Sequence, residues 1–363
     1  MSQQIKHNPL WTVMIPPLGI AILGLSWAAP GLPGILALLV LGLVGSVIAS
    51  VHHAEVIAHR VGEPFGTLVL ALAVTVIEVA LIVSMMLSGG ESTSGLARDT
   101  VFAAVMIILN GIIGASLLVG GRKHHVQGFK LDGINAALGA LTVIVVFTLI
   151  VPNYSTSAPG PVYTSSQLVF VAIATLVLFA AFTFFQTIRH RDYFLPADEG
   201  EKDPHQHAAQ PTNPEALASL GLLLLALVAV VLSAKGISPS IEAALNAVDA
   251  PASTIGILIA AIVLLPESVA AIRAAHANRL QTSLNLAIGS AIASIGLTVP
   301  VVAVLAVVMG WPLALGLDTK STLLLVLSLF VVSISLRTGR TTVLPGVVHL
   351  VIFAAYLFLS FVP

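Results

Sequence analysis

The stretch that decides the fold is Gly256–Pro300, GILIAAIVLLPESVAAIRAAHANRLQTSLNLAIGSAIASIGLTVP. It contains two apolar segments joined by a short basic turn, each close to the roughly 20 residues that a helix needs to cross a bilayer. The first segment carries one carboxylate, Glu267, directly after Pro266. A charged side chain at the bilayer centre costs about 2.5–3.5 kcal/mol on insertion scales. Glu267 therefore predicts a functional site inside the membrane, with a partner elsewhere in the chain.

The composition predicts an all-α integral membrane protein. Of the 363 residues, 57% are hydrophobic and 9% are charged, whereas a soluble domain carries about 25% charged residues. The net charge of −1 gives no basic surface for nucleic acid. The absence of cysteine excludes disulfides and thiolate metal sites. We expect no cofactor, and the oligomeric state is left open.

Apolar runs punctuated by Gly, Pro and charged clusters predict eleven membrane spans. The polar N-terminus shows no cleavage pattern, so we expect the first span to be retained. The predicted spans are residues 10–28, 32–51, 65–88, 99–121, 132–151, 166–188, 216–234, 252–274, 282–309, 319–336 and 341–362.

Basic residues are unevenly distributed between the two sides of these spans. Twelve of the 15 Lys and Arg residues lie on the side of the N-terminus, and only Arg98, Lys235 and Lys320 lie on the other. The positive-inside rule then predicts the orientation of a multi-pass membrane protein. Its N-terminus is expected in the cytoplasm and its C-terminus outside.

The longest polar segment divides the spans into two sets. Residues 190–215, rich in acidic residues and His, are predicted to form a cytoplasmic linker. Residues 1–30 form an extra first helix, which leaves five spans in residues 31–189 and five in residues 216–363. An odd number of spans forces the two halves into opposite orientations, so we predict a 5+5 inverted repeat, an arrangement common in secondary transporters.

Two carboxylates remain inside the predicted spans, because 14 of the 16 acidic residues lie in loops or at span ends. They are Glu78 and Glu267, at matching places in the two halves. An inverted repeat brings such positions together near the midplane. Two carboxylates in a low-dielectric cavity cannot both stay ionised without a cation, so they hold either protons or metal ions. The alternative is that one or both are protonated and packed as neutral hydrogen-bonding groups.

Further oxygen atoms share helix faces with this pair. Pro266 cannot donate to the carbonyl of Ile262, which predicts a broken helix with free carbonyls beside Glu267 but an intact helix around Glu78. The alternatives are that the hydroxyls bond their own i−4 carbonyls and that the proline is a packing kink. The predicted supporting oxygens are the side chains of Thr75, Asn110, Ser116, Ser290 and Ser294 and the backbone of Val74, Ile262 and Val263.

Five segments of the chain resemble the calcium/cation exchanger superfamily, and within it the calcium/proton exchangers of bacteria. The segments are residues 59–78, 114–122, 265–268, 289–300 and 337–356. The resemblance implies a ten-helix inverted-repeat core with an extra first helix, located in the bacterial inner (plasma) membrane. It also implies Glu78 and Glu267 as the cation and proton ligands. Many calcium/proton exchangers have Gly-Asn shortly before each Glu, where this chain has Val74-Thr75 and Val263-Leu264.

The predicted function is a secondary antiporter that exports Ca²⁺, and possibly Na⁺ and K⁺, in exchange for protons. Ca²⁺ suits the site because it takes several oxygen ligands. This chain lacks the Asn side-chain amides of those Gly-Asn pairs. A Na⁺/H⁺ or K⁺/H⁺ antiporter with little Ca²⁺ activity is therefore an alternative. The sequence lacks the usual motifs of an intramembrane enzyme. A channel would need polar groups along its whole ion path, rather than two carboxylates at the midplane.

Histidines gather on the predicted cytoplasmic side. His52, His53, His59, His124 and His125 are predicted to form a pH-responsive rim, because imidazole titrates near neutral pH. The alternative is that they are solvated loop residues. His349 lies inside a span, where a proton relay and an interhelical hydrogen bond are both open.

Replacing all five rim histidines with Gln is expected to shift the pH profile of antiport, because Gln is polar but does not titrate in this range. The measurement is the exchange rate of everted vesicles across pH 6–9. A profile that does not move would remove the pH-sensing role.

Overall fold

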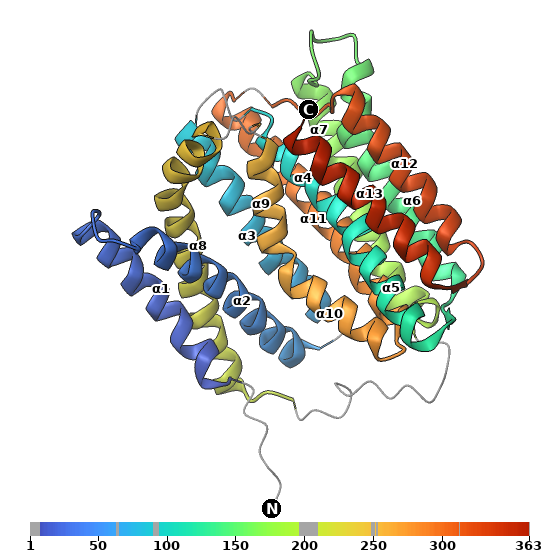
Figure 1. Cartoon of the computed structure of the whole chain (residues 1–363), viewed down its shortest axis with the longest axis horizontal. Coiled ribbons are helices and arrows are strands. Elements are labelled where there is room, and N and C mark those ends of the chain that lie inside the picture. Colours follow the sequence, from blue (N-terminus) through green and yellow to red (C-terminus); the bar gives the residue numbers. More distant parts are fainter. Residues whose placement is uncertain are drawn as a thin grey trace, which may run out of the picture. The chain divides into compact units, whose positions relative to one another are not determined.

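The computed structural model describes residues 8–62, 65–89, 94–195, 210–247, 251, 253–311 and 313–362, and it is almost entirely helical (Figure 1). The elements are α1 Leu10–Ala28, α2 Ile35–Val61, α3 Phe65–Gly89, α4 Leu96–Met106, the π-helix η2 Ile107–Ile112, α5 Ile113–His124, β1 Gln127–Gly128, α6 Leu131–Val145, η3 Val146–Ile150, η4 Val151–Tyr154, α7 Ser165–Phe184, η5 Phe185–Arg189, η6 Arg191–Tyr193, α8 Asn213–Ala247, α9 Ser253–Val263, α10 Leu265–His276, α11 Leu280–Met309, α12 Thr319–Leu336, β2 Arg340–Thr341 and α13 Val343–Phe361.

The described helices confirm the predicted number of spans. Ten are long and apolar enough to cross a membrane, and there are eleven when α9 and α10, which meet at a 55° bend, count as one. Two helices extend beyond the apolar runs that predicted them, because backbone hydrogen bonding does not stop where hydropathy falls. Helix α2 continues to Val61 and ends at Gly62, whose φ of 75° suits a residue without Cβ. Helix α8 has 35 residues and continues past Pro239.

Two compact units make up the chain. Unit 1 consists of residues 1–89 and 202–249, and unit 2 consists of residues 90–201 and 250–363. These units cut across the predicted halves, because α8 from the second half packs with α1, α2 and α3 from the first. The central part of the predicted linker, residues 196–209, lies outside the described residues.

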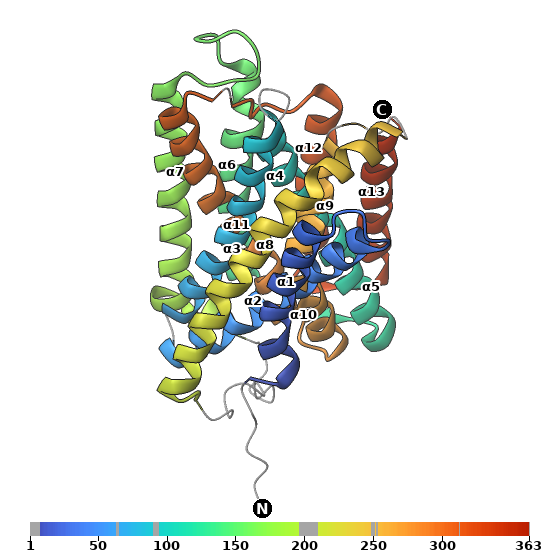
Figure 2. The same ribbon diagram turned by 90° about the vertical axis from the view of Figure 1, so that its left-hand side faces the viewer.

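Unit 1 is held by small and apolar side chains. Ala54, Ala73 and Leu223 form a buried cluster that joins α2, α3 and α8. At one end of the unit, Arg60 Nε donates to Asn213 Oδ1 at 2.8 Å, which ties the end of α2 to the start of α8. Figure 2 shows the long α8 running beside α1 and α2.

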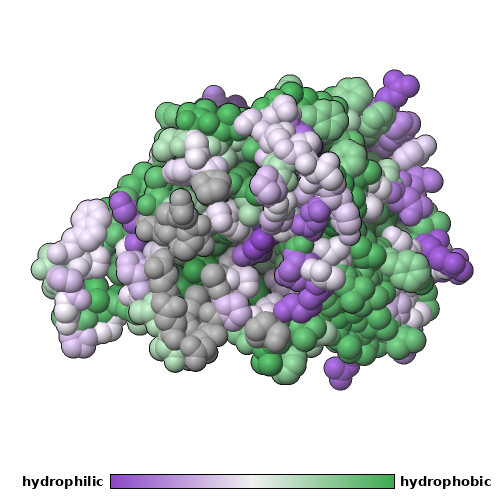
Figure 3. Space-filling view, turned by 90° about the horizontal axis from the view of Figure 1, so that it is seen from above, coloured by the Kyte–Doolittle hydropathy of each residue, from purple (hydrophilic) through white to green (hydrophobic). Residues whose placement is uncertain are grey.

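Unit 2 contains helices with two distinct faces. On α13, Gly346, His349 and Tyr356 are buried, whereas Leu344 and Phe358 on the other side are 69% and 63% exposed. Exposed large apolar side chains of this kind are expected to face lipid. Figure 3 shows hydrophobic side chains over much of the visible surface, with hydrophilic side chains gathered in separate patches.

Polar loops close one end of unit 2, which we call the basic end and define by Lys123, Lys130, Arg273 and Arg340. Strands β1 and β2 pair there, with Gln127 opposite Thr341. Lys130 N donates to Gln281 Oε1 at 2.6 Å, and Gln127 Nε2 donates to Ala275 O at 2.9 Å. These bonds connect the turn after α5 to the last turn of α10 and the first turn of α11.

The Gly346→Ala substitution is expected to destabilise unit 2. A Cβ at Gly346 would lie 2.5 Å from Leu118 N and 2.8 Å from Gly114 O, so α5 and α13 would have to separate. Gly139→Ala is the matched control, because a Cβ there meets nothing within 4 Å. We expect a lower thermal midpoint in detergent for the first variant and an unchanged or higher midpoint for the second. Equal midpoints would contradict the close packing of α5 on α13.

Candidate cation site

Glu78 lies on an unbroken helix of unit 1. Glu78 is 2% exposed, and α3 continues on both sides of it from Phe65 to Gly89. Thr75 is buried on the same helix, and its Oγ1 donates to Ala71 O at 2.8 Å. The hydroxyl of Thr75 thus bonds the carbonyl four residues earlier, which is the alternative given for these hydroxyls. Its oxygen lone pairs can still accept a hydrogen bond or contact a cation. The carbonyl of Val74 lies in regular helix, where it accepts from the amide four residues on.

Glu267 lies at a helix break in unit 2. Helix α9 ends at Val263, α10 begins at Leu265, and their axes differ by 55°. Pro266 and Glu267 both stand in the first turn of α10. This confirms the predicted break, and its position fits the missing N–H of Pro266, which cannot donate to the carbonyl of Ile262.

The break changes the electrostatics around Glu267. The positive end of a helix dipole favours a negative side chain, and Glu267 stands in the first turn of α10. Ile262 and Val263 lie in the last turn of α9, where carbonyls lack intrahelical donors. The carbonyl of Leu264 is already occupied, since Ser268 donates to it through N at 2.9 Å and Oγ at 2.6 Å. Carboxylate and carbonyl oxygens thus occur together at this break.

The two Glu residues belong to different compact units, Glu78 to unit 1 and Glu267 to unit 2. Each environment is described by itself, and the pairing of the two carboxylates stays a prediction. Their helices differ in the way the sequence predicts, with an intact α3 around Glu78 and a break before Glu267.

Asn110 is part of a buried polar network in unit 2. It is 0% exposed and lies in the π-helical segment η2. Asn110 Nδ2 donates to Ser328 Oγ at 2.8 Å, and Asn110 Oδ1 lies 3.2 Å from Nδ1 of His349. Ser328 Oγ in turn donates to Leu324 O at 2.7 Å. The amide predicted as a supporting oxygen therefore bonds α12 and α13.

This network fixes the ring of His349. The amide oxygen of Asn110 can only accept, so Nδ1 of His349 carries the proton and Nε2 keeps a lone pair. The interhelical hydrogen bond considered for His349 is thus present. The sequence analysis did not predict Ser328. In the sequence it is only a hydroxyl among the apolar residues of one span, and many serines with a purely structural role look the same.

The remaining predicted hydroxyls differ in their surroundings. Ser116 is 0% exposed, and its Oγ has no hydrogen-bond partner among the residues that the structure describes. Ser294 is buried on α11, while Ser290 is half-buried. All of them belong to unit 2, together with Glu267.

The five predicted rim histidines lie in both units. His52 and His53 pack on α1, with the ring of His52 5.9 Å from that of Trp11 and His53 Nε2 donating to Thr12 O at 3.0 Å. His53 is fully buried, whereas His59 is exposed at the end of α2.

His124 and His125 lie at the basic end of unit 2. His124 Nε2 donates to His276 O at 2.9 Å, and His125 is exposed. The placement of the histidines in helix α2 and in this turn leaves their pH-sensing role a prediction.

The model of the sodium/calcium exchanger protein family matches residues 31–188 and again residues 218–362. The chain belongs to the sodium/calcium exchanger family. It is 48% identical over 360 residues to a putative ionic transporter, y4hA, of Sinorhizobium fredii, covering 98% of this chain and 97% of the relative. It is 36% identical over 354 residues to the sodium-potassium/proton antiporter ChaA of Escherichia coli, covering 96% of each. The fold is that of native YfkE, with a TM-score of 0.74 at 16% identity over 97% of this chain and 100% of that one.

The Asn110→Leu substitution is expected to lower the free energy of unfolding by about 1–3 kcal/mol, because it leaves a buried His349 N–H without an acceptor. In Asn110→Leu/His349→Leu both partners are apolar, so the cost should be less than the sum of the single costs. Denaturation in detergent micelles measures each value.

The matched control for this cycle is Ser116→Ala, which removes a buried hydroxyl that makes no hydrogen bond with described residues. Ser116→Ala should change the free energy of unfolding only slightly. Additive single costs would show that Asn110 and His349 do not interact.

Proposed function

We propose that this member of the sodium/calcium exchanger family is a secondary active antiporter that exports a cation in exchange for protons. Glu78 and Glu267 serve as shared cation and proton ligands near the membrane midplane. The site loads a cation on the cytoplasmic side while it releases protons, and outside it takes protons back. Releasing two protons for one divalent cation keeps the charge of the site constant.

The break before Glu267 is the observation that carries this proposal. An interrupted helix inside a span places a carboxylate, a helix N-terminus and last-turn carbonyls at one position. Such backbone is tolerated at membrane depth where protein or water surrounds it. The buried Glu78 on α3 supplies a second intramembrane carboxylate.

Two compact units suit alternating access. We infer that unit 1 and unit 2, rather than the two sequence halves, are the bodies that move during transport. The internal repeat remains part of the proposal, and the two stretches matched by the family model nearly coincide with the predicted halves. The loops of the basic end lie in the cytoplasm by the positive-inside rule, with the C-terminus outside.

Ca²⁺ is the cation we propose first, because two carboxylates with backbone oxygens match its preference for hard oxygen ligands. A Na⁺/H⁺ or K⁺/H⁺ antiporter is the second candidate. Two observations favour it: the amide of Asn110 is engaged with His349 and Ser328, and a relative at 36% identity is named a sodium-potassium/proton antiporter.

Everted vesicles that contain the protein should show proton efflux when the transported cation is added, and Glu78→Gln and Glu267→Gln should each abolish it. Gln keeps the size of the side chain but cannot exchange a proton for a cation. Asp132→Asn is the control, because Asp132 is exposed in the first turn of α6.

Comparing Ca²⁺, Na⁺ and K⁺ in the same assay identifies the cation. Full activity of either Gln variant would overturn the role of the Glu pair. Cation flux without proton movement would indicate a channel.

A further inference from the structure

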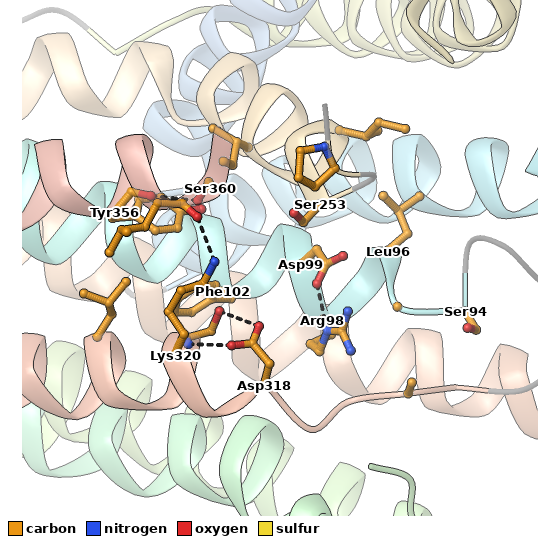
Figure 4. Close-up of a pocket in the computed structure, with 18 residues that line it drawn as sticks. Ser94, Leu96, Arg98, Asp99, Phe102, Ser253, Asp318, Lys320, Tyr356 and Ser360 are labelled. Atoms are coloured by element: carbon orange, nitrogen blue, oxygen red, sulfur yellow. Dashed lines mark hydrogen bonds and ion pairs between the residues drawn. The ribbon is translucent and has the colours of Figure 1, made fainter. Parts of the chain in front are cut away.

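A charged cavity lies in unit 2, and Glu267, the intramembrane carboxylate of this unit, is not among the described residues that line it. Its volume is about 430 Å³, and its walls are the first turns of α4, α9 and α12 and the last turns of α13 (Figure 4). Asp99 and Arg98 line it from α4, and Asp318 and Lys320 line it from α12. The helices that meet the cavity run from it toward the basic end, so the two features mark opposite ends of unit 2.

Both positive side chains are held by backbone oxygens. Arg98 Nη1 donates to Gly316 O at 3.3 Å and its Nε donates to Asp99 Oδ1 at 2.7 Å. Lys320 Nζ donates to Leu359 O at 2.8 Å. A guanidinium has five N–H donors and an ammonium has three. Both groups therefore keep donors for a ligand beyond the bonds that fix them in place.

Both negative side chains are also fixed by hydrogen bonds, which they accept from neighbouring donors. Asp318 caps α12, with Oδ1 accepting from Ser321 N at 2.8 Å and Oδ2 from Ser321 Oγ at 2.9 Å. Burial acts to raise the pKa of Asp318, but the bonds from Ser321 and the charge of Lys320 outweigh it and hold the pKa below its ordinary value. Asp99 uses one oxygen for Arg98, and Figure 4 shows its carboxylate between Arg98 and Ser253.

The cavity thus presents two positive and two negative groups. Arg98 and Asp99 form an ion pair, and the charge of Lys320 acts on Asp318, so these four groups are neutral as a set. A ligand with only one sign of charge would disturb this balance. A ligand that carries both charges complements all four groups, with its anion on Lys320 and Arg98 and its cation on Asp99 and Asp318. Charge-assisted hydrogen bonds of this kind are roughly twice as strong as neutral ones.

The position of the cavity indicates where such a ligand comes from. The ends of four helices meet there. The ends of membrane-spanning helices are expected near the membrane–water interface. The neighbouring outer faces of α12 and α13 are apolar, with Leu323 69% and Phe358 63% exposed. Acyl chains can lie along these faces while a headgroup occupies the cavity.

We propose that this cavity binds the headgroup of a zwitterionic phospholipid that carries a primary ammonium group. The phosphate accepts from Lys320 and Arg98, and the ammonium donates to Asp99 and Asp318. A quaternary ammonium has no N–H to donate, so the site discriminates between two zwitterionic headgroups of equal net charge. The proposal concerns a lipid site and is independent of the antiport activity.

Native mass spectrometry of the full chain in detergent tests this site. The probes are phosphatidylethanolamine, phosphatidylcholine and phosphatidylglycerol with identical acyl chains. We expect phosphatidylethanolamine to bind the wild type about tenfold more tightly than the other two, the effect of one or two charge-assisted hydrogen bonds. Asp99→Asn keeps an oxygen for Arg98 and removes the charge, and it should abolish the preference.

Asp192→Asn is the matched control, since it removes one negative charge from an exposed turn at the basic end. A second variant, Lys320→Gln, should weaken phosphatidylethanolamine and phosphatidylcholine alike, because both lose their phosphate partner. Thermal midpoints in detergent confirm that each variant is folded.

Soluble phosphoethanolamine separates headgroup recognition from lipid binding. Because the headgroup makes the charged contacts, weak competition by it is expected. If the free compound bound as tightly as phosphatidylethanolamine, the acyl chains would contribute nothing, and the assignment to a lipid would be overturned. Equal affinity for phosphatidylethanolamine and phosphatidylcholine, or a preference that survives Asp99→Asn, would overturn the site itself.

Discussion

The cost of removing a carboxylate from water is the constraint on which this structure depends. An isolated charge in hydrocarbon is strongly unfavourable, so each intramembrane Glu needs a proton, a cation or a set of dipoles. The chain meets this need differently at its two sites. Glu78 is buried on an intact helix, whereas Glu267 stands in the first turn of a new helix after a 55° break. Because the two environments differ, the proposed exchange of protons and cation is expected to be unequal at the two carboxylates.

The polar core of unit 2 follows the same constraint. Asn110 and His349 are completely buried, and Nδ1 of His349 donates to Oδ1 of Asn110. Ser328 completes the network on a third helix. Asn110 lies in a π-helical segment, a distortion that often occurs at functional sites. This network links η2, which carries Asn110, to α12 and α13. It therefore holds three elements of unit 2 together, the unit that also contains Glu267.

Close packing without large side chains holds these helices together. Gly346 brings α13 against the backbone of α5, and Gly256 brings α9 against Asp99 and Thr100 of α4. In a bilayer such small residues matter because lipid offers no hydrophobic drive for helices to associate. The contact at Gly256 also positions the first turn of α9 at the charged cavity, so one small residue affects both packing and a polar surface.

Hydropathy, charge and one proline were enough to determine the spans, the two intramembrane carboxylates and the break before Glu267. These are properties of single segments, and a helix in lipid must satisfy its own backbone. Only the tertiary structure decided that α8 joins α1, α2 and α3, that Asn110 bonds His349, 239 residues away, and that His53 is buried against α1. It also decided that four charged residues from α4 and α12 share one cavity. Apolar helix faces are nearly equivalent in composition, so partner choice depends on side-chain shape and on hydrogen bonds between distant segments, which no local pattern encodes.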